Sequence, residues 1–196
     1  MTVAIAILAA GRGSRLGGDD AKPLVLLRDR PLVTWALDAA VGSGLHPVWL
    51  VTGYRGHDVR AAAPQGVDVV HNRHWRQGIA SSLRAALEAL APYAEVTAVC
   101  VGLADQPQVG SEAYRRLAAT HADGAQLAVA TYDGVRGNPV LLARSLWAEA
   151  NVLEGDVGAR QLMKQHDVVE VPCEGTGSAV DVDTPQDLEQ LNEERA

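Results

Sequence analysis

The sequence is poor in residues that build aromatic cores or disulfide frameworks. It has no phenylalanine, and aromatic residues make up only 4% of its 196 residues. We therefore expect a core of Leu, Val, Ile and Ala, which suits close packing of helices against a sheet. The two cysteines, Cys100 and Cys173, lie far apart and form no C-x-x-C pair. They are interpreted as buried or incidental thiols of a reducing compartment.

Basic charge and long apolar runs are also missing. The formal net charge is -7, which argues against a general nucleic-acid binder, because such proteins carry a basic face or stripe. No apolar run approaches the roughly 20 residues of a membrane span. The apolar residues 2–10 follow no basic residue and lead into a Gly/Arg loop, which is unlike a signal peptide. The expectation is a cytoplasmic protein with no nucleic-acid or membrane partner.

Two familiar nucleotide-binding motifs are absent as well. A Walker A loop ends in G-K-[ST], whereas Lys22 is followed by Pro23. The dinucleotide fingerprint is G-x-G-x-x-G, whereas Gly11, Gly13 and Gly17 have a longer spacing. The sequence also shows no Ser/His/Asp or Cys/His arrangement of a nucleophilic enzyme. These absences argue against a P-loop protein and make a nicotinamide or flavin enzyme a weak alternative.

Strand patterns do alternate with helix patterns along the whole chain. Apolar runs predict strands at residues 3–8, 47–52, 67–70, 96–103, 126–131 and 168–171. Periodic apolar positions predict helices at 32–41, 55–63 and 111–122, two more that end near 90 and 165, and a last one that begins at 184–185. This order is typical of an α/β protein with a single-domain, mostly parallel, doubly wound sheet flanked by helices. A turn at Asp133-Gly134 adds a small antiparallel hairpin element. One domain is expected over residues 1–191, followed by a frayed tail at 192–196.

The loop after the first strand has the composition of a phosphate-binding site. It reads L-A-A-G-R-G-S-R-L-G-G-D-D-A-K-P-L over residues 8–24. Gly11 and Gly13 allow backbone N–H groups to approach an anion, and Arg12, Arg15 and Lys22 supply positive charge. The alternative is a flexible surface loop with solvated basic residues. Because the loop follows a buried strand, we favour phosphate binding.

Three aspartates stand where they can hold a cation beside that loop. Asp105 follows the most continuous apolar strand, and Pro107 stops that strand, so the carboxylate lies at the mouth of the sheet. There a divalent cation can join it to phosphate oxygens. The alternative is that Asp105 only caps the following turn. Asp181 and Asp183 alternate in an extended segment and so point the same way, and either can be a second oxygen ligand.

Several other polar positions keep two interpretations. Ser81 and Ser82 lie near the start of the helix that ends near residue 90, where they either cap it or join a ligand site. Gly137, before Asn138-Pro139, marks an unusual backbone beside a ligand or a bulge. Asp156 is either the N-cap of the helix ending near residue 165 or a residue that faces a ligand.

Six motifs, in order, resemble those of the MobA-like nucleotidyltransferases, and most closely their molybdenum cofactor cytidylyltransferase branch. The motifs are L-A-A-G-x-x-x-R-x-G with a following Lys at 8–22, N-x-x-W-x-x-G-x-x-S-S-L at 72–83, L-A-D-Q-P at 103–107, R-G-N-P-V at 136–140, G-D-x-G-A-R at 155–160 and D-V-D-T-P-x-D-L at 181–188. They span nearly the whole chain. Residues 18–21 make the gap before Lys22 longer than that branch usually has. The opening L-A-A-G, in place of the L-A-G-G of guanylyl-transferring relatives, implies use of CTP instead of GTP.

The resemblance implies a role for residues of each motif. The implied nucleotide-binding residues are Ala9, Ala10, Gly11, Arg12, Gly13, Arg15, Lys22, Gly78 and Ser82. Of these, Arg15 would contact the β and γ phosphates, Lys22 the α phosphate, and Gly78 and Ser82 the base. The implied catalytic residues are Arg15, Lys22 and Asp105. The implied Mg²⁺ ligands are Asp105 and Asp183, and Asp181 is the alternative to Asp183. The implied acceptor-binding residues are Arg136, Asn138, Asp156 and Arg160.

The activity implied by the resemblance is nucleotidyl transfer. An NTP, with CTP favoured, would give its nucleoside monophosphate to a phosphate-bearing acceptor such as molybdopterin, with release of pyrophosphate. An enzyme that receives the product is an implied protein partner. Positioning and charge neutralisation supply most of the rate of such a reaction, so it needs no nucleophilic side chain. The alternatives are a nucleotidyltransferase for a sugar phosphate, a polyol phosphate or a phosphoenolpyruvate-like acid, and a non-catalytic nucleotide-binding protein.

Overall fold

The computed structural model describes residues 1–13 and 21–193 of the chain. Arg15, expected at the β and γ phosphates, lies outside the described residues. The strands are β1 (Thr2–Ala9), β2 (Leu26–Leu27), β3 (Arg30–Pro31), β4 (Val48–Thr52), β5 (Asp68–His71), β6 (Val96–Leu103), β7 (Leu127–Tyr132), β8 (Val135–Ala143) and β9 (Val169–Pro172). The helices are α1 (Leu32–Gly42), α2 (Gly56–Ala61), α3 (Ile79–Leu90), α4 (Ser111–Ala122), α5 (Trp147–Ala150) and α6 (Pro185–Glu193). The 3-10 helices are η1 (Lys22–Leu24), η2 (Trp75–Gln77), η3 (Arg144–Leu146) and η4 (Gly158–Lys164).

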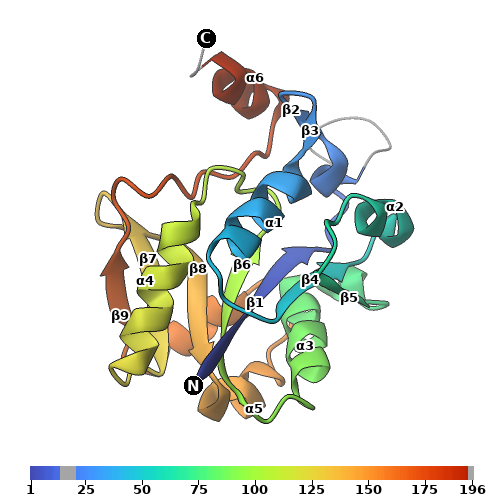
Figure 1. The fold of residues 1–196 in the computed structure, drawn as a ribbon. Coiled ribbons are helices and arrows are strands. Elements are labelled where there is room, and N and C mark those ends of the chain that lie inside the picture. Colours follow the sequence, from blue (N-terminus) through green and yellow to red (C-terminus); the bar gives the residue numbers. More distant parts are fainter. Residues whose placement is uncertain (14–20, 194–196) are drawn as a thin grey trace.

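Most strands of the described chain lie in one seven-stranded sheet with the order β5-β4-β1-β6-β8-β7-β9 (Figure 1). β1 pairs in parallel with β4 and β6, β4 with β5, and β7 with β9. β8 runs antiparallel to both β6 and β7. The expected α/β class, with a mostly parallel sheet and an antiparallel hairpin, is therefore confirmed. A separate two-stranded sheet, β2-β3, was not anticipated from the sequence.

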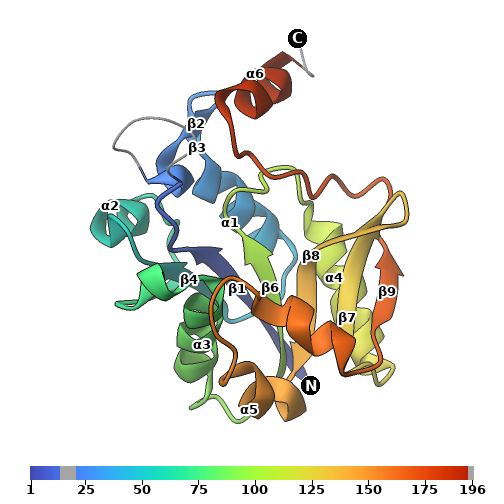
Figure 2. The same ribbon diagram turned by 180° about the vertical axis from the view of Figure 1, so that it is seen from behind.

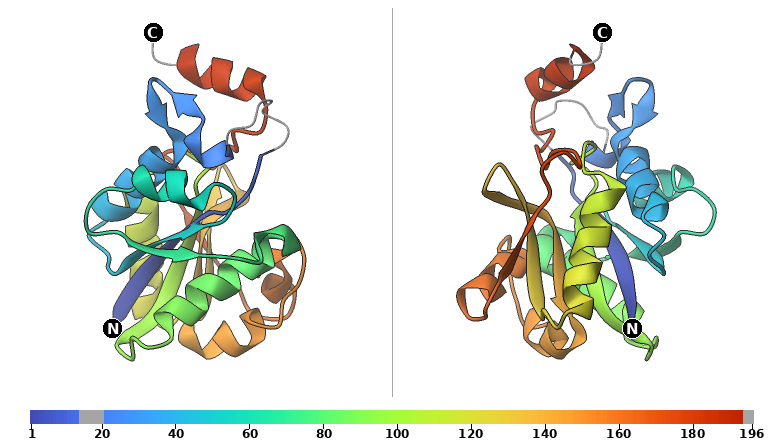
Figure 3. Two further views of the ribbon diagram at one scale, coloured as in Figure 1. Left: turned by 90° about the vertical axis from the view of Figure 1, so that its right-hand side faces the viewer. Right: turned by 60° about the vertical axis from the view of Figure 1, so that its left-hand side comes forward.

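Two hydrophobic cores cover the two faces of the sheet. Along β1 the side chains alternate between them, so that Ile5 and Ile7 belong to one core while Ala6 and Leu8 belong to the other. The first core is closed by α1, α2 and α4, and the second by α3, α5 and η4. Figures 1 and 2 show these two sets of helices on opposite sides of the sheet, and Figure 3 shows the layers from the side.

The core fills space without phenylalanine by pairing a large tyrosine with a glycine. Tyr114 of α4 is only 1% exposed. A Cβ added to Gly102 of β6 would lie 2.3 Å from the Tyr114 hydroxyl oxygen. The ring therefore lies against bare backbone of the sheet, and burial raises the pKa of the Tyr114 phenol.

Most expected boundaries lie within two residues of the observed ones, and the last two helical segments show the differences. The helix expected to end near residue 165 is the 3-10 helix η4, and it begins at Gly158. Gly155 and Gly158 both have positive φ, 67° and 50°, so the chain turns twice where an α-helix would have to begin. α6 continues to Glu193 and so includes residues 192 and 193 of the expected tail. Within residues 1–13 and 21–193, no helix has the length and hydropathy needed to cross a membrane.

The order of the strands locates the edge at which a ligand is expected. From β1 the chain moves to β4 and β5 on one side, and then returns to β6 on the other side of β1. The neighbouring strands β1 and β6 therefore form a switch point, and open α/β sheets bind ligands outside the carboxyl ends of such strands. Leu8 to Gly13 and Leu103 to Asp105 occupy those ends.

Candidate functional site

The turn after β1 is tied by its backbone to the ends of the two neighbouring strands. The Ala104 N–H donates to the Leu8 carbonyl oxygen at 3.1 Å, and the Tyr54 N–H donates to the Ala10 carbonyl oxygen at 3.1 Å. Ala104 follows β6 and Tyr54 follows β4. This turn, residues 10–13, is called the glycine turn. It thus has a fixed position at the carboxyl ends of three strands, β1, β4 and β6.

The far end of the opening loop returns to the same turn. The Lys22 N–H donates to the Arg12 carbonyl oxygen at 3.2 Å. Gly13 has a φ of 68°, and a Cβ at this position would lie 2.3 Å from the Lys22 Cβ. Only glycine permits this close approach, so Gly13 brings the Lys22 side chain beside the turn.

Lys22 joins two of the three aspartates that the sequence singled out. Its ammonium nitrogen Nζ donates to Asp183 Oδ1 at 2.6 Å and makes an ion pair with Asp105 Oδ2. The Lys22 side chain is only 12% exposed. Burial lowers the pKa of this amine, but the two carboxylates outweigh that effect and the pKa of Lys22 is raised overall. Lys22 is therefore held as a cation between the two carboxylates.

The segment that carries Asp183 lies along the turn after β6. The Val182 N–H donates to the Asp105 carbonyl oxygen at 2.9 Å, and the Val182 side chain is fully buried. The Gln106 amide nitrogen Nε2 donates to Asp181 Oδ1 at 2.8 Å. Desolvation and the nearby Asp105 charge raise the pKa of Asp181. Asp181 is thus bound by an amide, whereas Asp183 contacts Lys22.

The start of α6 holds Asp183 in place. Asp187 Oδ2 accepts hydrogen bonds from the backbone N–H groups of Asp183 at 2.9 Å and Thr184 at 2.7 Å. The Asp187 N–H in turn donates to Thr184 Oγ1 at 3.2 Å. This is a capping box, and it fixes the direction in which the chain enters the helix.

The carboxylates of Asp105 and Asp183 suit a cation that takes its remaining ligands from a substrate. In the part of the chain that the structure describes, no three His, Cys, Asp or Glu side chains form a metal-binding group. Mg²⁺ typically binds one or two protein carboxylates and takes its other ligands from phosphates and water. Asp105 and Asp183, which already hold an ammonium ion, fit that donor set.

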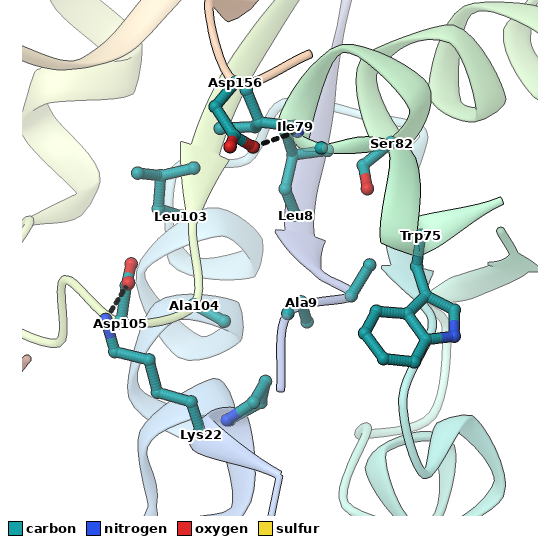
Figure 4. Close-up of a pocket in the computed structure, with 14 residues that line it drawn as sticks. Leu8, Ala9, Lys22, Trp75, Ile79, Ser82, Leu103, Ala104, Asp105 and Asp156 are labelled. Carbon is teal, nitrogen blue, oxygen red and sulfur yellow. Dashed lines mark hydrogen bonds and ion pairs between the residues drawn. The ribbon is translucent and has the colours of Figure 1, made fainter. Parts of the chain in front are cut away.

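A cavity of about 230 Å³ opens beside Lys22 and Asp105. Figure 4 shows Lys22 and Asp105 on one side of it and Trp75 and Ser82 on the other. Seven of the residues expected at the nucleotide or metal line it: Ala9, Ala10, Gly11, Lys22, Gly78, Ser82 and Asp105. The structure therefore brings residues of three separate motifs around one space at the end of β1 and β6.

The two serines of α3 belong to a buried hydrogen-bond network and do not cap the helix. Asn72 Nδ2 donates to Ser81 Oγ at 2.8 Å and to Ser82 Oγ at 3.1 Å. Ser81 Oγ donates to the carbonyl oxygens of His74 and Gly78, at 3.0 and 2.8 Å. α3 begins at Ile79, so both serines already lie inside the helix. Their network fixes the loop that carries Trp75.

Asp156 caps α3 from another part of the chain. Its Oδ1 accepts a hydrogen bond from the Ile79 N–H at 3.3 Å, and the Gly155 carbonyl oxygen accepts one from the Ala80 N–H at 3.1 Å. No side chain caps η4, so Asp156 is not the N-cap of its own helix. Gly78 has a φ of 94°, and a Cβ there would lie 2.5 Å from the Gly155 carbonyl. Glycine at position 78 thus allows this crossing of two segments.

A second cavity, of about 570 Å³, adjoins the first and shares Leu8, Ile79, Leu103 and Asp156 with it. The four residues expected at the acceptor all line it: Arg136, Asn138, Asp156 and Arg160. Its remaining lining is largely aliphatic, from Leu83, Val101, Val129, Val140 and Met163. Arg136 is oriented by an ion pair with Glu170, whose Oε1 lies 2.7 Å from Arg136 Nε. The cavity therefore combines an apolar floor with polar and basic groups.

Sequence reasoning assigned no role to three residues that complete the site: Tyr54, Trp75 and Gln106. Trp75 lines the smaller cavity, and its ring packs against the Tyr54 ring with centroids 5.5 Å apart. The Arg12 guanidinium lies 5.3 Å from the centre of the Tyr54 ring. Gln106, only 3% exposed, ties Asp181 to the turn after β6. Trp75 and Gln106 stand inside motifs that were recognised, so their positions were a usable signal.

The chain is similar in sequence and in fold to known proteins. The sequence model of the MobA-like NTP transferase domain matches residues 5–171. The molybdenum cofactor cytidylyltransferase of Escherichia coli strain K12 is 26% identical over 191 residues, which cover 93% of this chain and 91% of that protein. The crystal structure of Rv0371c from Mycobacterium tuberculosis H37Rv has a TM-score of 0.87 and 33% identity, and the match covers 98% of this chain and 97% of that one. A complex of Rv0371C with manganese has a TM-score of 0.84 and 30% identity, over 99% and 100% of the two chains.

The domain match covers most of the chain and both strands that carry the site. The resemblance drawn from the six sequence motifs is thereby confirmed at the level of the family. The chain belongs to the MobA-like NTP transferase family of nucleotidyltransferases.

Proposed function

We propose that this nucleotidyltransferase moves a cytidylyl group from CTP to the phosphate of molybdopterin and releases pyrophosphate. One observation carries the proposal: the turn after β1, Lys22, Asp105 and Asp183 converge at one edge of the sheet, and Lys22 and Asp105 line a cavity that adjoins a second one. The smaller cavity would hold the nucleotide and the larger one the acceptor.

The reaction needs little acid–base work from the protein. An oxygen of the acceptor phosphate attacks the α phosphorus of CTP, the bond from that phosphorus to the bridging oxygen breaks, and pyrophosphate leaves with the electron pair. A phosphate is already ionised at neutral pH, so no side chain has to remove a proton. Lys22 and the N–H groups of the turn would neutralise the phosphate charge, and positioning supplies the remaining rate.

Mg²⁺ is the proposed cofactor, held by Asp105 and Asp183. When bound, it would neutralise charge that develops on the phosphate oxygens. Support comes from the oxygen-only donor pair and from the manganese complex of a related protein. Asp181 is the weaker candidate, because Gln106 already binds its carboxylate.

The preference for CTP is supported by Ala10, which lines the smaller cavity and stands where the opening motif of guanylyl-transferring relatives has glycine. A methyl group at this position would leave less room for the larger purine base. Ala10→Gly is therefore expected to raise the ratio of kcat/KM for GTP to that for CTP. Ala104→Gly, which enlarges the same cavity on its acidic side, is the matched control and should leave the ratio unchanged.

The acceptor is proposed from the chemistry of the larger cavity. Its aliphatic floor suits a flat heterocycle, and Arg136 and Arg160 suit an anionic group.

A pyrophosphate-release assay with CTP, GTP, ATP and UTP tests the proposal. Each nucleotide is assayed with molybdopterin, with sugar phosphates and without an acceptor, and each assay is repeated with a metal chelator. Release that requires CTP, molybdopterin and a divalent cation is expected. Release with sugar phosphates alone would remove the acceptor assignment, and no release with any pair would contradict the proposed activity.

A further inference from the structure

The Lys22 ammonium occupies the place where the two carboxylates meet. Its Nζ is 2.6 Å from Asp183 Oδ1 and also pairs with Asp105 Oδ2. A Mg²⁺ or Mn²⁺ ion bound by the same oxygens would lie about 2.0–2.2 Å from each of them. An ammonium nitrogen and a divalent cation cannot share that position. Binding of the metal to both of these oxygens therefore requires the Lys22 ammonium to leave.

We propose that Lys22 is a built-in cation that holds the Asp105–Asp183 pair until a nucleotide arrives, so that the divalent metal binds together with the nucleotide and only weakly before it. The inference rests on the proposed function, because the nucleotide provides the phosphate to which the ammonium moves. It assigns Lys22 a second role, as a competitor of the metal.

The surroundings of Lys22 allow that exchange of partners. The Lys22 backbone is fixed by the hydrogen bond from its N–H to the Arg12 carbonyl oxygen and by close contact with Gly13. The side chain is a flexible four-carbon stem, and it lines the smaller cavity together with Asp105. A triphosphate in that cavity would lie within reach of the ammonium without any movement of the backbone.

The metal, in contrast, has a weak site without the nucleotide. In residues 1–13 and 21–193, no third acidic, His or Cys side chain joins the pair to form a metal-binding group. A metal ion that arrives alone must displace an ammonium bound to both carboxylates and has no phosphate ligand in return. A metal ion that arrives with a nucleotide gains phosphate ligands, while the ammonium gains a phosphate partner.

Titration with Mn²⁺ alone, followed by electron paramagnetic resonance, tests the inference without nucleotide or turnover. Lys22→Met removes the ammonium and keeps the length of the side chain, so we expect its affinity for Mn²⁺ to exceed that of the wild type by about tenfold or more. Lys22→Arg keeps the charge and should bind as weakly as the wild type. The sequence has only one other lysine, Lys164, which is exposed. Lys164→Met is therefore the matched control for the loss of one positive charge.

Several results would overturn the inference. Mn²⁺ affinity of Lys22→Met equal to or below that of the wild type would do so, as would tight binding of Mn²⁺ alone by the wild type. Extra binding that survives in Lys22→Met/Asp105→Asn would place the ion elsewhere and also overturn it. Lys22→Gln serves as the second variant if Lys22→Met does not fold, which a thermal melt without metal establishes.

The titration and the activity assay fail independently. Unchanged Mn²⁺ affinity in Lys22→Met, with pyrophosphate release intact in the wild type, removes only the inference about Lys22. Stronger Mn²⁺ binding in that variant, with no pyrophosphate release by the wild type for any NTP, removes only the proposed function.

Discussion

Replacing Asp105 by asparagine keeps the shape of the side chain and removes its charge. Asp105 pairs with Lys22, and 23% of its side chain is exposed. Two unit charges about 3 Å apart attract by roughly 5 kcal/mol at an effective dielectric constant of about 20, and lost solvation offsets most of that energy. Lys22 keeps Asp183 as a partner, so we expect the free energy of unfolding to fall by about 1–2 kcal/mol. The melting temperature should then fall by roughly 2–8 °C for a chain of this length.

The activity of Asp105→Asn is expected to fall much further than its stability. Loss of a proposed metal ligand should lower kcat for pyrophosphate release by about a thousandfold, measured with saturating CTP and acceptor. Asp38→Asn is the control, because Asp38 pairs with Arg30 but its side chain is 53% exposed. That change should cost less than about 0.5 kcal/mol and leave kcat intact. Near wild-type kcat in Asp105→Asn, or a loss of kcat that only mirrors unfolding, would refute the reasoning.

Three further predictions concern the surroundings of the pair. Gly78→Ala is expected to lower the free energy of unfolding by about 1–3 kcal/mol from strain alone, and further because the new Cβ would lie 2.5 Å from the Gly155 carbonyl. Gly124→Ala is the control, because φ there is 106° but no atom lies within 4 Å of an added Cβ, so only backbone strain lowers its stability. Both variants are compared by urea unfolding, and equal losses of unfolding free energy would contradict the role of the contact with Gly155. Asp181→Asn should keep turnover, unlike Asp183→Asn, and should be more stable than the wild type at neutral pH but not in acid. The pKa of Asp181 is higher in the folded state than in the unfolded state, so the wild type loses stability as pH rises from the pKa of the unfolded state to that of the folded state. Thermal melts in which Asp181→Asn and the wild type differ equally at every pH would contradict this prediction. Lys22 should be acylated more slowly than Lys164 at about pH 8. Acylation needs a neutral amine, and the two carboxylates raise the pKa of Lys22. Equal labelling of the two lysines, measured by peptide mass spectrometry, would contradict the ion pairs of Lys22.

Local sequence patterns predicted the framework well because they reflect backbone geometry. The apolar run at 96–103 and the periodic pattern at 111–122 coincide with β6 and α4. Each has a signal that is independent of the rest of the fold: a run too apolar for a surface strand, and a helical spacing that follows a start signal. The sequence also placed Asp105 at the end of a strand, and the structure has it just after β6. The switch point between β1 and β6 became evident only from the order of the strands in the sheet.

Contacts between distant segments could not be predicted in the same way. Lys22 meets Asp105 and Asp183 across 83 and 161 residues of sequence, and no local pattern encodes which of two alternating aspartates it reaches. The buried Val182 decides the matter, because it and the Gln106 hydrogen bond fix how the segment lies. For Asp156 the sequence left two roles open, the N-cap of its own helix or a residue that faces a ligand. The structure excludes the first, because the glycine-rich turn before η4 crosses α3 and Asp156 caps that helix instead.

The adjoining cavities bear on the choice between a transferase and a protein that only binds a nucleotide. A regulatory nucleotide-binding protein needs the smaller cavity and the basic groups around it, but gains nothing from the larger one. Here the larger cavity shares a wall with the smaller one, formed by Leu8, Leu103, Ile79 and Asp156, because β1 and β6 are neighbours and α3 begins beside their ends. Ligands in the two cavities would therefore approach each other beside these four residues. Because group transfer needs two ligands with their reacting atoms about 3 Å apart, this proximity favours catalysis over binding alone.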